Sequence, residues 1–201
     1  MRLRPLSLAL FLILPGEVSA LVRSSIVRPQ SSFSVSSHQV YYQIQGNTAA
    51  DLRAQMDRLG PVDRSTGKRY DAFANWIFSW RYRDRVVAGM CRFTGVKLVV
   101  QLKYTYPRWS PPAGVSARLA RRWNRYLGVL RRHENGHGAI AVREGREILA
   151  QMRAIGPRGS CQRLQAAADL VGVRGVERTN RIEASYDART SHGSTQGAHF
   201  P

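Results

Sequence analysis

Cysteine and long apolar segments are both scarce in this chain of 201 residues. The two cysteines, Cys91 and Cys161, each lack a second cysteine at CxxC spacing, which disfavours a cysteine-based zinc site. Beyond the N-terminal segment, no stretch approaches the roughly 20 uninterrupted apolar residues of a transmembrane helix. The sequence therefore predicts no transmembrane segment in the mature chain.

Acidic residues are also few. The chain has 13 Asp and Glu against 31 Lys and Arg, which gives a formal net charge of +18. Such a charge can attract nucleic acid, anionic lipid or acidic polymers. The arginines are scattered, however, and the densest run, residues 118–132, interleaves with an apolar stripe. This pattern favours a solvated basic helix face over a dedicated polyanion site. In a periplasm, anionic envelope polymers would be the natural partners.

The N-terminus has the pattern of a secretory signal peptide. Arg2 and Arg4 precede an apolar run at residues 6–14, and small residues follow at 18–20, the spacing that signal peptidase accepts. We therefore expect residues 1–20 to be removed and the mature protein to be periplasmic or secreted. No cysteine follows the expected cleavage site, so a lipid anchor is not expected there.

An exported chain with an even number of cysteines favours a disulfide. Oxidising compartments stabilise such bonds, and we expect Cys91 and Cys161 to pair. Closing a loop of this length would destabilise the unfolded state by roughly 4 kcal/mol. The alternative is two separate buried thiols.

The mature chain is long enough for one domain with a substantial core. Residues 21–37 are rich in serine and predict a flexible leader, and residues 38–201 then form a single domain. Alternation at residues 40–44 predicts a strand. Thr48 and Asp51 have the spacing of a capping box and indicate a short helix after it.

Two later segments alternate apolar and polar residues and predict strands of a small antiparallel sheet. Residues 76–82 place Trp, Phe, Trp and Tyr on one face, and residues 96–106 do the same with Val, Leu and Tyr. The aromatic set resembles a sugar platform or a base-stacking surface, but such regular alternation is more typical of a core face.

The second half is helical. Apolar residues recur at steps of three and four from about Val115 to Arg153 and predict one long helix. Ser160 is a suitable cap for a second helix that returns against the first and reaches Tyr186, although Gly172 and Gly175 are candidate interruptions. The predicted fold class is α+β and zincin-like: a small sheet with a short helix, a long helix and an antiparallel return helix.

The long helix contains the segment HENGH, formed by His133 to His137. Residues at i and i+4 lie on the same helix face, so the two imidazoles can hold one metal ion while Glu134 lies beside it. A catalytic zinc has three protein ligands and one position for water, whose proton a neighbouring carboxylate accepts. Both histidines also fall on the inward stripe, where unpaired polar groups are costly. The motif predicts a Zn²⁺ site with Glu134 as the catalytic base.

The residues alone leave the third metal ligand open. Glu144 shares the helix face, but seven residues beyond His137 it lies about 10 Å further along a continuous helix, so we expect a structural role or a position behind the ligands. An antiparallel return helix would bring Glu183 opposite His133. Helix counting therefore favours Glu183.

Several motifs resemble those of an uncharacterised bacterial family described as predicted secreted zinc-dependent proteases. The resemblance runs from Tyr41 through the rest of the chain and rests on YYQIQG, GPVD, the Trp-rich strand, the two cysteines, HENGH and the ending YDARTSHG. In that family the tail carries Tyr and Asp followed by a Thr-x-His-Gly unit. The corresponding positions are Tyr186, Asp187, Thr190 and His192.

The resemblance implies a ligand set of His133, His137 and His192, with Glu183 or Asp187 in place of His192 if that side chain points away. Imidazole is a ligand that zinc accepts readily. Asp187 is otherwise expected to orient a ligating histidine. For Tyr186 two roles stay open: donation to the oxyanion that forms during hydrolysis, or packing on the return helix.

The expected function is a zinc-dependent peptidase acting on peptide or protein substrates in the cell envelope, with Glu134 transferring the proton from water to the leaving amine. An extended substrate would pair with an exposed strand edge, and we expect residues 96–106 to provide the neighbouring sheet. The alternatives are a non-catalytic basic envelope-binding protein and a zinc amidase that cleaves peptidoglycan crosslinks. The sequence does not indicate an oligomeric state.

Overall fold

The computed structural model describes residues 31–64 and 66–200. The expected signal peptide at residues 1–20 lies outside this part of the chain. The elements follow in the order β1 (Ser32–Ile44), α1 (Ala49–Leu59), β2 (Phe73–Val87), β3 (Met90–Trp109), α2 (Ala117–Arg153), α3 (Cys161–Thr190) and a short 3₁₀ helix, η1 (Ser194–Gln196). This order confirms the predicted α+β fold.

The sheet has the strand order β1-β3-β2. β2 and β3 form an antiparallel hairpin, but β1 lies parallel to β3, so the sheet is mixed and the prediction of a purely antiparallel sheet is wrong. After β1, the chain passes through α1 and enters β2 at the opposite edge of the sheet, so that the later strand β3 lies between them. β2 runs opposite to β1, and β3 reverses direction again at the hairpin, so β3 runs parallel to β1.

β1 begins earlier than the sequence pattern indicates. Residues 32–37, which we expected in the flexible leader, pair with Lys97 to Leu102 of β3. Backbone hydrogen bonds to β3 do not depend on the side chains, so a serine-rich segment can occupy an edge strand without an apolar face of its own. Side-chain alternation alone does not reveal such a strand.

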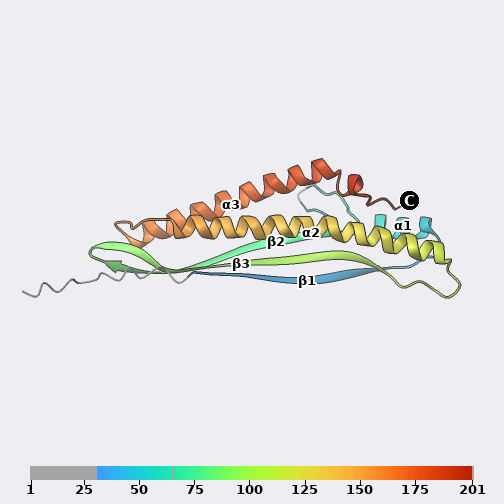
Figure 1. Cartoon of the computed structure of the whole chain (residues 1–201), viewed down its shortest axis with the longest axis horizontal. Helices are drawn as coiled ribbons and strands as arrows, with labels where there is room; N and C mark the ends of the chain where they lie inside the picture. The colour runs from blue at the N-terminus through green and yellow to red at the C-terminus, as the bar shows by residue number, and fades with distance from the viewer. Residues whose placement is uncertain (1–30, 65, 201) are drawn as a thin grey trace, which may run out of the picture.

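One face of the sheet carries the core. α2 runs along this face, and α3 packs antiparallel against α2 while also contacting β2 and β3 (Figure 1). Phe78, Leu98 and Val100 are buried beneath α2, and Trp76, Trp80 and Tyr82 pack against the same core. The aromatic residues of β2 therefore form a core face, as predicted.

Both long helices begin at serine caps, of which the one at Ser160 was predicted. The Ser116 side chain accepts from Leu119 N at the start of α2, and the Ser160 side chain accepts from Arg163 N at the start of α3. The capping box of Thr48 with the Asp51 side chain likewise starts α1.

The two glycines suspected of breaking α3 do not interrupt it. A Cβ at Gly172 would lie 2.4 Å from Trp80 Cζ2, and one at Gly175 would lie 2.3 Å from Ile148 Cγ1. Because neither glycine has a side chain, α3 can approach β2 and α2 closely. This packing offsets the loss of helix propensity at the two positions.

Cys91 and Cys161 form the predicted disulfide, with Cα atoms 5.0 Å apart. It joins the start of β3 to the first turn of α3. Backbone hydrogen bonds between Cys91 and Arg158, of 2.8 and 3.0 Å, reinforce this junction. Within the described part of the chain, no helix combines the length and apolar character that crossing a bilayer requires.

Candidate metal centre

The HENGH segment lies in the middle of α2, where an uninterrupted helix places His133 and His137 one turn apart. Their side chains face α3 and are almost fully buried, with relative exposures of 3% and 7%. The two Nε2 atoms are 3.3 Å apart. The imidazoles therefore point toward a common position, as the motif predicts.

Asp187 on α3 completes a triangle of donor atoms with these rings. Its Oδ1 lies 3.3 Å from His133 Nε2 and 3.0 Å from His137 Nε2. Zinc ligands at bond lengths of about 2.0–2.2 Å in a tetrahedral arrangement are themselves about 3.3–3.6 Å apart. The three distances among His133, His137 and Asp187 are close to this spacing, so the triad fits a metal ion with little adjustment.

The other ring nitrogen of each histidine lies within hydrogen-bonding reach of a side-chain oxygen. His133 Nδ1 donates to Gln196 Oε1 at 3.1 Å, and His137 Nδ1 donates to Glu183 Oε2. Protonation at Nδ1 satisfies these two acceptors and leaves the Nε2 atoms to share a cation with Asp187 Oδ1. A proton on Nε2 that is donated to Asp187 fills this role, and a metal ion bound by the same three atoms would replace that proton.

The electrostatics of the triad point the same way. Burial disfavours a charged imidazolium, but hydrogen bonds to Asp187 and Glu183 outweigh it and raise the pKa of His137 to about 10. Burial favours the neutral form of Asp187, yet the two histidines hold the pKa of this carboxyl well below its usual range. In both cases the surroundings stabilise positive charge at the centre of the triad, which also favours a metal ion.

Glu134 is buried beside this centre, with 5% relative exposure. Burial raises the pKa of its carboxyl, and the charge of Asp187 adds to the effect, whereas His137 and His133 oppose it; the result is about 7. The backbone N–H of Ala74 at the start of β2 donates to the carboxylate. Glu134 thus lies between α2 and the start of β2.

Tyr186 packs directly on the two histidines. Its ring stacks on His133 at 5.1 Å between centroids and meets His137 edge-on at 4.9 Å. Its hydroxyl donates to the His133 carbonyl and accepts from Gln196 Nε2. A Cβ at Gly136 would lie 2.2 Å from this hydroxyl, so the glycine before His137 makes room for Tyr186.

His192 lies outside the triangle of donors. Its side chain is half exposed, with Nδ1 3.5 Å from Asp187 Oδ1 and its ring 5.2 Å from that of Tyr70. The structure thus brings His192 to the same carboxylate but groups Asp187, and not His192, with the two motif histidines. Glu183, the other sequence candidate, holds His137 from behind through Nδ1.

Glu144 has the structural role expected for it. Its carboxylate pairs with Arg178 Nε at 2.7 Å and Arg143 Nε at 3.1 Å, away from the triad.

The segment after α3 folds back over the metal centre. Ser191, His192 and Gly193 all have positive φ, and Thr190 Oγ1 accepts from Gly193 N, so the chain reverses immediately after the helix. Gly193 packs against His133, where an added Cβ would lie 3.1 Å from Cγ. Phe200 is then buried against the aromatic rings of α2.

Two functional contacts of this site were not predicted, those of Gln196 and Ala74. Gln196 lies in a polar tail without periodicity, and the Ala74 contribution is a backbone N–H, so neither has a signal in the sequence. In contrast, the spacing of Glu183 and Asp187 was a usable signal. Two carboxylates at i and i+4 on the return helix match the two histidines at i and i+4 on the first.

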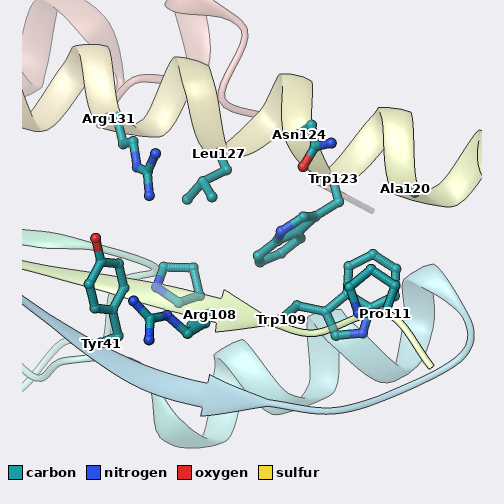
Figure 2. A pocket seen from close by; sticks show the side chains of 10 residues that line it. Tyr41, Arg108, Trp109, Pro111, Ala120, Trp123, Asn124, Leu127 and Arg131 are labelled. Atoms are coloured by element: carbon teal, nitrogen blue, oxygen red, sulfur yellow. The ribbon is translucent and has the colours of Figure 1, made fainter.

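A separate cavity of about 190 Å³ lies between α2 and the end of β3 (Figure 2). Aromatic residues and two arginines surround it, among them Tyr41, Trp109 and Trp123 with Arg108 and Arg131. It shares no residue with the triad. The cluster of Asp84 with the two cysteines is no metal site either, because both sulfurs are in the disulfide.

The fold and the triad together define an α+β protein with a candidate metal site between an HENGH helix and an antiparallel return helix. The chain belongs to a family described as bacterial protein of unknown function, DUF922, whose model matches residues 39–193. The match includes every residue of the triad. No curated protein and no solved structure is a significant match to this chain.

Proposed function

We propose that this protein is a zinc-dependent peptidase of the bacterial cell envelope. The observation that carries the proposal is the convergence of His133 Nε2, His137 Nε2 and Asp187 Oδ1 in a buried space beside the Glu134 carboxyl. Two imidazoles and one carboxylate are a donor set typical of catalytic zinc, which keeps its fourth position for water. The disulfide agrees with an oxidising compartment.

Zinc bound to this triad would lower the pKa of a water molecule toward about 7 and polarise the scissile carbonyl. Glu134 accepts the proton of that water and later donates it to the leaving amine. Burial suits it to both steps, because a carboxyl with a pKa near neutrality gains and loses a proton with similar ease. The backbone N–H of Ala74 stabilises the ionised carboxylate and so opposes the effect of burial on its pKa.

Glu183 and Gln196 hold the two histidines from behind. Each accepts the Nδ1 proton of one ring and so presents Nε2 to the metal. Tyr186 packs on both rings while its hydroxyl is engaged by the His133 carbonyl and Gln196. Packing is thus the role that its contacts support; donation to an oxyanion stays a prediction, and it would require this hydroxyl to leave the His133 carbonyl.

An extended substrate would bind along β2. We expected residues 96–106 to provide the neighbouring sheet edge, but that segment lies in β3, which is paired on both sides. β2 has a described strand on one side only, and its Ala74 N–H reaches Glu134 at the metal centre. Peptide groups added to this edge would lie beside the catalytic carboxyl.

His192 separates the catalytic reading from a structural one. If its Nδ1, now 3.5 Å from Asp187 Oδ1, joined the triad as a fourth ligand, the coordination shell would be closed and the zinc would be structural. The protein would then be the non-catalytic envelope-binding protein that its basic charge also allows. An amidase acting on peptidoglycan crosslinks would use the open site on a different amide.

Metal content and hydrolysis together test the proposal. We expect one zinc per wild-type chain by elemental analysis, loss of zinc in Asp187→Ala, and retention in His192→Ala and in Glu177→Ala, a control at an exposed acid on the same helix. Glu134→Gln should keep the metal and lose cleavage of a peptide library. If Asp187→Ala kept its zinc and His192→Ala lost it, His192 and not Asp187 would be the third ligand. If Glu134→Gln cleaved peptides as fast as wild type, Glu134 would not be the catalytic base. Release of fragments from purified sacculi, without peptide cleavage, would identify the amidase.

A further inference from the structure

Most of the positive charge of the described chain has no acidic partner, and part of it is arranged in an ordered way. Beyond the metal centre, β2 and β3 continue as a long hairpin whose tip lies at the end of the molecule near the start of α3 (Figure 1). The helices cover one face of this hairpin. The face away from the helices, referred to below as the distal hairpin face, carries five exposed cationic side chains: Arg81, Arg83, Arg85, Arg92 and Lys97.

The register places like charges directly opposite each other. Arg81 pairs with Lys97, and Arg85 pairs with Arg92. Opposite side chains in an antiparallel pair are about 4.5–5.5 Å apart at Cβ, so like charges at such positions repel. Within residues 31–64 and 66–200, none of the five cations forms an ion pair. The nearby Asp84 alternates to the other face, where it accepts from Gln165.

The tip of the hairpin is apolar and exposed. Val86, Val87 and Met90 have relative exposures of 64%, 38% and 38%. They flank a tight turn at Ala88 and Gly89, both of which have positive φ, as a two-residue hairpin turn of type I′ requires. An apolar tip adjacent to a cationic face is unusual for a surface that meets only water.

The tip is also held rigidly in this position. Cys91, next to Met90, is bonded to Cys161 of α3 and exchanges two backbone hydrogen bonds with Arg158. The apolar side chains therefore cannot fold back onto the core without breaking this junction. Exposure of the tip is a fixed property of the fold.

We infer that the distal hairpin face and its apolar tip dock on an anionic phospholipid bilayer. The cations match a negatively charged lipid surface, and the tip side chains match the shallow apolar layer beneath the headgroups. A soluble polyanion would use the cations but leave the tip in water, so the tip favours the bilayer. This inference goes beyond the proposed peptidase activity, since docking requires neither zinc nor Glu134.

Flotation with lipid vesicles tests the docking. The mature chain should float with vesicles of phosphatidylglycerol and phosphatidylcholine but not with pure phosphatidylcholine, and high salt should release it. Each basic residue near such a surface contributes about a fivefold gain in partitioning, so replacing Arg81, Arg83, Arg85 and Arg92 by Gln should weaken binding by roughly several hundredfold. The pair Val87→Ser with Met90→Ser should also weaken binding, with the net charge unchanged.

A charge-matched control replaces four exposed arginines of α2 by Gln: Arg118, Arg121, Arg125 and Arg132. It should retain vesicle binding, although it has the same net charge as the hairpin variant. If the hairpin variant and the α2 variant lost vesicle binding equally, net charge alone would explain the binding, and the hairpin would not be the docking surface. If the Val87→Ser/Met90→Ser variant bound vesicles as well as wild type, the tip would not enter the bilayer, and the cationic face would be assigned to a soluble polyanion instead. Circular dichroism confirms that each variant is folded.

Discussion

The close packing of α2 against the sheet beside His137 leads to a sharp prediction about Gly138. A Cβ at Gly138 would lie 1.9 Å from Tyr104 Oη and 3.0 Å from Tyr104 Cζ, whereas its next contact, with Leu102 Cδ1, is an ordinary 3.5 Å. Gly138→Ala therefore meets one side chain, Tyr104, whose hydroxyl is by far the closest atom. No hydrogen bond to that hydroxyl is present among the described residues.

The magnitude follows from two opposing effects. Alanine in place of glycine inside a helix stabilises by up to about 1 kcal/mol. Overpacking a buried contact destabilises by about 1–3 kcal/mol. We therefore expect Gly138→Ala to lower the free energy of unfolding by up to about 2 kcal/mol. In the Tyr104→Phe background the hydroxyl is absent and only the ring carbon at 3.0 Å must shift, so the same substitution should cost much less or be neutral.

Urea denaturation of the four proteins of this double-mutant cycle, in the presence of a chelator, measures the coupling without a contribution from bound metal. Gly128→Ala is the control, because an added Cβ at Gly128 has no neighbour within 4 Å and should stabilise by up to about 1 kcal/mol. If Gly138→Ala had the same effect with Tyr104 as with phenylalanine, close approach of the hydroxyl would not be the reason for glycine there. The reasoning would also be refuted if Gly138→Ala, in the protein with Tyr104, stabilised the fold as much as Gly128→Ala does.

Three further perturbations have defined outcomes. Replacing Cys91 and Cys161 by alanine opens a loop with a sequence separation of 70 residues and should lower the free energy of unfolding by about 4 kcal/mol in urea denaturation; an unchanged midpoint would contradict this. Gln196→Ala removes an acceptor behind a metal-binding ring and should weaken zinc binding by about 10- to 100-fold in a competition assay with a chromophoric chelator. Burial raises the pKa of Glu144, but the hydrogen bonds from Arg178 and Arg143 outweigh burial and lower this pKa below its usual value. The Glu144 carboxylate therefore stabilises the fold at a pH above its unfolded pKa, and this stabilisation is lost as the pH falls through its folded pKa. Glu144→Gln should lower the free energy of unfolding by about 1.5–3 kcal/mol at neutral pH. In urea denaturation at acid pH, the difference from wild type should shrink.

The elements that the sequence predicted are those with a local cause. The apolar stripe of α2, the Ser160 cap of α3 and the capping box of α1 each depend on residues within one or two turns. The HENGH geometry is local in the same sense, because helix periodicity alone places His133 and His137 on one face. The disulfide followed from composition and compartment, without knowledge of the fold.

The elements that it did not predict depend on distant parts of the chain. Side-chain alternation is the same for parallel and antiparallel neighbours, so the direction of β1 relative to β3 could not be obtained from residues 32–44 themselves. The Glu134 contact with Ala74 requires β2 to begin beside α2, which no local pattern encodes. Gln196 reaches His133 only because the chain reverses after α3.

The positions of Asp187 and His192 show how one helix end decides which side chains converge on the motif histidines. α3 continues to Thr190, so Glu183 and Asp187 stand one turn apart on its inner face, one behind His137 and the other between the two motif rings. His192 comes after the helix, where a left-handed turn carries its ring outward toward Tyr70. A histidine there can move relative to the motif rings, whereas Asp187 is fixed by its helix. The ligand supplied by a rigid element is the better choice for a preorganised site, and the tail then acts by holding His133 through Gln196.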